Sequence, residues 1–100
     1  MEINVISQES PYTFQIVGRL DTNTAPTLEE FIQTVYDKNI NDIFVDCEEC
    51  DFVSSAGLRV IVAMQKHASG TQGNLAFKNV TPEIMQVFEM TGFNNILTFV

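Results

Sequence analysis

The stretch DFVSSAGLRVIVAMQK, residues 51–66, places two adjacent serines directly before an alanine, a glycine and a largely apolar run. Apolar residues recur in it three and four positions apart, which predicts a helix from about Ser55 to Ser69 with Gly70 as its stop. Its expected inner residues are Leu58, Ile61 and Val62, with Val60, Ala63 and Met64 widening the buried arc. Serine caps helices well because its oxygen accepts a backbone N–H of the first turn. The residues therefore leave two interpretations open for the pair: a helix cap alone, or a cap beside a chemically available hydroxyl.

The segments on both sides of this helix predict alternating strands and helices. Strands are expected at Ile3–Ser7, Tyr12–Val17, Asp42–Asp46 and Asn74–Lys78. A short last extended segment is expected at Ile96–Val100. Further helices are expected from Pro26 to Asn39 and from Thr81 to Gly92, with capping-box spacing between Thr27 and Glu30 in the first. This order predicts an α/β fold in one domain, residues 1–100. We expect a mixed four- to five-stranded sheet with an N-terminal hairpin and about three main helices packed on it.

The loops that follow parallel strands gather at one sheet edge, where open α/β folds bind ligands and partners. At this edge we place Asp21, within a polar loop from Gly18 to Thr24, and the acidic residues Asp46 and Asp51 beside the serine pair. A helix N-terminus tolerates a phosphate, and a phosphoserine adds about −1.5 to −2 charges. A phosphate here would make the surface more negative and bulkier, and would expel a docked partner.

The composition is that of a globular chain of one-domain size, with 45% apolar and 18% charged residues. No run approaches the roughly 18 apolar residues of a membrane helix, so membrane insertion is not expected. The N-terminus MEINVISQES lacks the basic and apolar regions of a secretory signal. We therefore expect a cytoplasmic protein.

The net charge restricts the class of partner. It is −8, with only five scattered basic residues. A nucleic-acid binder needs a basic stripe that displaces counterions, so no nucleic acid is expected. The acidic balance favours protein partners with basic patches.

Nucleophilic catalysis by the serines is not supported. A catalytic serine needs a general base, and the sole histidine, His67, lies about three turns further along the same predicted helix. The sequence contains neither a G-x-S-x-G elbow nor a P-loop. We therefore predict that the protein is not an enzyme.

Cys47 and Cys50 form a C-x-x-C pair. Their acidic neighbours, Asp46, Glu48, Glu49 and Asp51, would raise the thiol pKa values, which disfavours a redox dithiol. A zinc site would need two more ligands. We interpret the pair as reduced thiols and expect no metal and no cofactor.

Three motifs in this chain resemble the STAS family, whose stand-alone members are anti-sigma factor antagonists of bacteria. They are Gly18-Arg19-Leu20-Asp21 with Thr24-Ala25-Pro26, Ile43-Phe44-Val45-Asp46 with Phe52-Val53-Ser54-Ser55-Ala56-Gly57-Leu58, and Met90-Thr91-Gly92-Phe93. The resemblance covers essentially the whole chain, and its middle motif is the most specific. It implies a non-enzymatic protein that sequesters an anti-sigma factor with serine kinase activity.

The resemblance also implies a switch by phosphorylation. The kinase would phosphorylate Ser55 and release the partner, and a metal-dependent serine phosphatase would restore binding. The residues implied to bind the partner are Asp21, Thr22, Ser54, Ser55, Gly57, Leu58 and Arg59. Many regulated family members carry an aspartate where this chain has Ser54. The Ser54 hydroxyl is a second candidate acceptor.

Two alternatives to this switch remain. Some STAS proteins are not phosphorylated and act as scaffold subunits of larger complexes, such as lipid-transport ATPases. A dithiol module that uses Cys47 and Cys50 is the third hypothesis.

Overall fold

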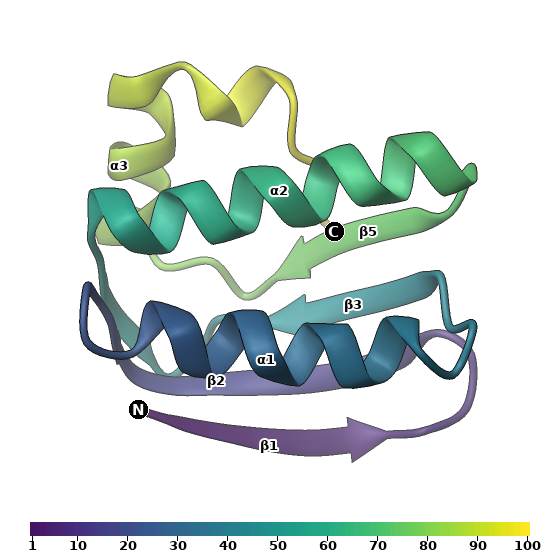
Figure 1. Ribbon diagram of the computed structural model, residues 1–100. Coiled ribbons are helices and arrows are strands. Elements are labelled where there is room, and N and C mark those ends of the chain that lie inside the picture. The colour runs from purple at the N-terminus through teal and green to yellow at the C-terminus, as the bar shows by residue number, and fades with distance from the viewer.

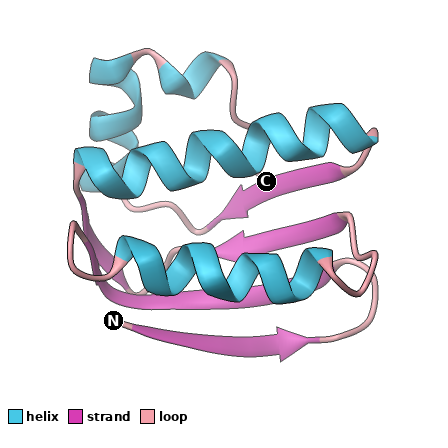
Figure 2. Cartoon of the chain, in the orientation of Figure 1, coloured by secondary structure: helices cyan, strands magenta, loops and turns pink.

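The computed structural model describes all residues 1–100 and contains one mixed β-sheet with α1 and α2 lying side by side across it (Figure 1). The strands are β1 (Glu2–Ser7), β2 (Tyr12–Leu20), β3 (Asp42–Asp46), β4 (Cys50–Val53) and β5 (Asn74–Lys78). The helices are α1 (Ala25–Tyr36), α2 (Ser55–Thr71), α3 (Pro82–Thr91) and a short 3₁₀ helix (Phe93–Asn95). The strands run in the order β1-β2-β3-β5, with β4 paired to β2. Only the β1–β2 hairpin is antiparallel (Figure 2), which confirms the predicted α/β class and mixed sheet.

The core lies between the sheet and the helices. Because successive side chains of a strand point to opposite faces, Phe14 and Ile16 of β2 share a face and both are buried. Phe14 contacts Phe31 of α1, with ring centroids 4.9 Å apart. The most deeply buried partners from other elements are Leu28, Val35, Val45, Met64, Phe77, Ile84 and Phe88. This packing fixes α1 and α2 against the sheet.

The sheet differs from the prediction at the end of β2. We expected β2 to end at Val17, but it continues to Leu20, and Gly18–Leu20 pairs in parallel with β4. The sequence did not indicate β4, because it is only four residues long and its two middle residues are exposed. Gly18 lies at the register shift between β2 and β4 with φ +95°, a conformation that favours glycine.

Other expectations also differ from the structure. Gly70 does not end α2, which continues to Thr71 and leaves through Gln72 in the left-handed conformation. Ala63, expected in the buried arc, is exposed. The segment Ile96–Val100 is not a strand: only Phe99 makes a bridge, in parallel to Phe77. By contrast, Gly92 does end α3, as predicted.

The first turn of α2 lies directly against the end of β2. A Cβ atom added to Gly57 would lie 2.7 Å from Leu20 Cγ and 2.8 Å from the Leu20 carbonyl oxygen. The backbone N–H of Ser54 also donates a hydrogen bond to that oxygen, with an N–O distance of 2.8 Å. Only glycine at position 57 allows this approach, and the approach places the loop after β2 beside the start of α2.

This contact predicts opposite effects for two glycines of the same helix. Gly57→Ala should lower the free energy of unfolding by about 1–3 kcal/mol, because the new methyl group would overlap Leu20. Gly70 has no atom within 4 Å of its potential Cβ position. Gly70→Ala should therefore raise stability by about 0.5–1 kcal/mol through helix propensity. Urea denaturation of both variants measures this, and a Gly57→Ala variant as stable as wild type would show that the close contact is dispensable.

Candidate functional site

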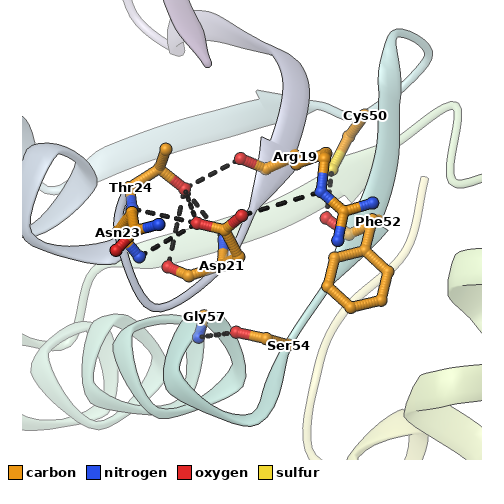
Figure 3. Close-up of polar contacts among 8 residues, drawn as sticks. All are labelled: Arg19, Asp21, Asn23, Thr24, Cys50, Phe52, Ser54 and Gly57. Carbon is orange, nitrogen blue, oxygen red and sulfur yellow. Dashed lines mark hydrogen bonds and ion pairs between the residues drawn. The ribbon is translucent and has the colours of Figure 1, made fainter.

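The carboxylate of Asp21 organises the loop between β2 and α1 (Figure 3). Its Oδ1 accepts hydrogen bonds from the backbone N–H groups of Asn23 (3.0 Å) and Thr24 (3.2 Å). The Asp21 N–H in turn donates to Thr24 Oγ1 at 2.8 Å. Burial opposes ionisation of this carboxylate, but the hydrogen bonds from Asn23 and Thr24 and the charge of Arg19 outweigh it and lower the pKa of Asp21. The loop therefore presents a fixed negative charge at neutral pH.

Arg19 connects this loop to β4. Its Nε lies 3.6 Å from Asp21 Oδ2, and its guanidinium carbon lies 4.1 Å from the centre of the Phe52 ring (Figure 3). Such a cation–π contact is favourable, and here it covers one face of a phenylalanine that is still 38% exposed. Sequence reasoning did not assign Arg19 or Phe52 to the site. No local sequence pattern indicates them, because the contact joins two segments that meet only in the folded chain.

The two serines have different environments. Ser54 is the N-cap of α2: its Oγ accepts a hydrogen bond from the Gly57 N–H at 3.3 Å (Figure 3). Ser55 is the first residue of the helix, it is exposed, and its hydroxyl makes no hydrogen bond within the chain. The cap interpretation thus accounts for Ser54 and leaves Ser55 as a free surface hydroxyl.

The other predicted partner-binding residues fall into two groups. Thr22 and Arg59 are exposed and line one shallow hollow between the Asp21 loop and α2. Gly57 and Leu58 are buried, so they support the surface from beneath. Asp46, which we expected beside the serines, instead accepts hydrogen bonds from Glu48 N–H and Asn79 Nδ2.

A larger hollow of about 500 Å³ lies at the opposite edge of the sheet, at the amino ends of β2, β3 and β5. Amide and hydroxyl side chains dominate its lining, and its one charged residue, Asp42, accepts a hydrogen bond from Ser10 Oγ at 2.7 Å. None of the predicted site residues lies there. The chemistry that the sequence indicated is therefore concentrated at the Ser55 edge.

The cysteines and the histidine do not contribute to this edge. Cys47 and Cys50 are both buried and free, and burial is the main cause that raises the pKa of each thiol. A raised pKa disfavours the reactive thiolate. His67 stacks on Tyr36 of α1 with ring centroids 3.5 Å apart, so it helps to join α1 and α2. The structure contains no group of three or more side chains that could hold a metal ion.

The fold and the site can be compared with known proteins. The family model described as STAS domain matches residues 2–100. This chain belongs to the STAS domain family. The resemblance seen in its three motifs is thereby confirmed.

The relatives and solved structures described next are named as anti-sigma factor antagonists. The anti-sigma-B factor antagonist of Staphylococcus aureus is 28% identical over 97 residues, which cover 97% of this chain and 90% of the relative. An anti-sigma factor antagonist from Mycobacterium paratuberculosis has the same fold, with a TM-score of 0.83 and 20% identity over 98% of this chain and 85% of that one. The anti-sigma factor antagonist SpoIIAA in its unphosphorylated form gives a TM-score of 0.79 at 17% identity, covering 99% and 86% of the two chains. No helix in this STAS domain combines the length and apolar character needed to cross a bilayer.

The serine pair of the STAS domain offers a matched test of the cap. Ser54→Ala should lower the free energy of unfolding by about 0.5–2 kcal/mol, because the Gly57 N–H loses its acceptor. Ser55→Ala should change it by no more than about 0.5 kcal/mol, because its hydroxyl bonds to nothing in the chain. Thermal and urea denaturation compare the two, and equal losses would contradict the division of roles.

The buried thiols predict a pH dependence of stability. Their pKa values are raised in the folded state. Below about pH 8.5, the pKa of a thiol in the unfolded chain, the thiols are therefore protonated in both the folded and the unfolded protein. Above that pH the unfolded chain loses these protons more readily, and the free energy of unfolding should fall. A Cys47→Ala/Cys50→Ala variant should lack this contribution. Urea denaturation from about pH 7 to about pH 9.5 measures it, and identical slopes for the two proteins would show that the thiols ionise freely in the fold.

Proposed function

We propose that this STAS domain is a cytoplasmic anti-sigma factor antagonist. In its unphosphorylated form it binds an anti-sigma factor with serine kinase activity, and phosphorylation of Ser55 releases that partner. The observation that carries the proposal is the exposed Ser55 hydroxyl, which no group in the chain engages, beside a neighbouring serine already used as the cap. The names of the relatives support the class of function, which is not enzymatic.

The geometry favours Ser55 over Ser54 as the acceptor. A kinase must place the serine oxygen in line with the γ-phosphoryl group of ATP, which requires an accessible hydroxyl. Ser54 Oγ is occupied by the Gly57 N–H and is only partly exposed. Transfer to Ser55 Oγ would form one O–P bond, release ADP and lose the hydroxyl proton to a base of the kinase. A metal-dependent serine phosphatase would hydrolyse the product and restore the hydroxyl.

The phosphate would act on the partner and leave the fold intact. Ser55 is at the N-terminus of α2, where the helix dipole favours a negative group. The added charge of about −1.5 to −2 would lie at the same edge as the fixed carboxylate of Asp21. A partner seated across the Asp21 loop and the start of α2 would meet both a larger side chain and a stronger negative field.

The direct test is phosphate mapping by mass spectrometry. The purified protein is incubated with ATP and the anti-sigma factor kinase encoded by the same genome. We expect one added phosphate at Ser55 in the wild type and in Ser54→Ala, and none in Ser55→Ala. We also expect Ser55→Ala to retain the kinase in the presence of ATP.

Two results would contradict the proposal. Phosphate on Ser54 of the Ser55→Ala variant, at the wild-type rate, would reassign the acceptor. No phosphate on any variant that still binds the same partner would instead favour a scaffold subunit that phosphorylation does not control.

A further inference from the structure

A groove of about 430 Å³ runs along α2 beside the turn that follows α3. In Figure 1 this turn, drawn in yellow, passes alongside the teal-green α2. Val62, Ala63 and Phe93 provide apolar surface in the groove, and the buried Leu58 lies beneath them. Ser55 lies at its start, and Arg59 and Lys66 also line it. Positions 55, 59, 62 and 66 share one face of the helix because they are spaced by three or four residues.

The charge of this groove is opposite to that of the whole chain. The protein carries a net charge of −8 and five basic residues, yet two of those five line the groove and no acidic residue does. The only ion pair in the structure joins Arg19 to Asp21, so Arg59 and Lys66 have no anionic partner. An apolar groove with two unpaired cations matches a ligand that is both apolar and acidic.

We infer that an acidic amphipathic segment of the protein partner docks in this groove. Its apolar side chains would pack on Val62, Ala63 and Phe93, while its carboxylates would bind Arg59 and Lys66. The inference rests on the proposed function for the kind of partner. It extends the expected partner surface to Val62, Lys66 and Phe93, and it adds the chemistry of the docked segment. Net charge alone favoured basic partners, so the groove defines a second, local preference.

The groove also connects docking to the switch. Arg59 lies one helical turn after Ser55, the spacing at which charged side chains on a helix interact. A phosphate on Ser55 would therefore compete with the partner's carboxylate for the Arg59 guanidinium, which binds phosphate well. Arg59 would exchange an intermolecular contact for an intramolecular one.

The probe for this surface is a helical peptide of about 15 residues with leucine on one face and glutamate on the other. A control peptide carries glutamine in place of every glutamate. Each is titrated into the ¹⁵N-labelled protein while backbone amide shifts are recorded by NMR. The protein variants are Arg59→Gln/Lys66→Gln and, as the matched control for charge, Lys38→Gln/Lys78→Gln, whose lysines lie outside the groove.

We expect the glutamate peptide to shift the amides of Ser55, Arg59, Val62, Lys66 and Phe93. Its affinity should fall about tenfold for the groove variant and for the glutamine peptide, and should stay unchanged for the control variant. Absence of these shifts, or equal affinity of the two peptides, would overturn the inference. This readout requires no kinase, so it stays separate from the failure or success of Ser55 phosphorylation.

Two other occupants of the groove are distinguished by the same spectra. Shifts at these amides on concentrating the protein alone would show that a second copy fills the groove. Shifts with phosphatidylglycerol vesicles that the glutamate peptide does not reverse would show a lipid surface. Either result would overturn the assignment to an acidic protein segment.

Discussion

The close contact between Gly57 and Leu20 is the constraint on which the site depends. The first turn of α2 lies so close to the end of β2 that a Cβ atom added to Gly57 would be 2.8 Å from the Leu20 carbonyl oxygen. Two segments far apart in the sequence, the Asp21 loop and the serine pair, meet there for this reason. A side chain at position 57 would separate them, and the surface that carries Asp21, Thr22 and Ser55 would no longer be continuous.

Around this contact the chain separates structural from chemical roles. The Ser54 hydroxyl caps α2, and the Ser54 N–H donates a hydrogen bond to the Leu20 carbonyl oxygen. The hydroxyl of Ser55 is therefore not needed for either contact. Asp21 is held by its own loop, and Arg19 stacks on Phe52, so the rim of the site is ordered before a partner arrives. Preorganisation of this kind reduces the entropy lost on binding. Ser55 and Arg59 are exposed on α2 beside this rim, and neither side chain forms a hydrogen bond or an ion pair within the chain.

Much of this was accessible from the sequence, and the misses have physical causes. The helical spacing around Leu58 and Ile61 predicted α2. The two serines before that run indicated a helix cap and left open whether a second hydroxyl is available. The short strand β4 was not predictable, because its pairing with Gly18–Leu20 depends on a contact distant in the sequence. The glycine at position 70 predicts a helix stop, whereas the helix continues through it to a left-handed Gln72. The Arg19–Phe52 contact and the groove along α2 are tertiary features that no local pattern indicates.

We propose, as the central claim, that a phosphate on Ser55 expels a partner from an otherwise unchanged surface. Its most direct test is calorimetric titration of the proposed partner, an anti-sigma factor, into unmodified protein and into protein phosphorylated at Ser55. Placing like charges together at an interface costs several kcal/mol, so we predict that the phosphorylated form binds about a hundredfold more weakly. Its amide spectrum should keep the wild-type shifts away from α2 and the Asp21 loop. Equal affinities for the two forms would contradict the account.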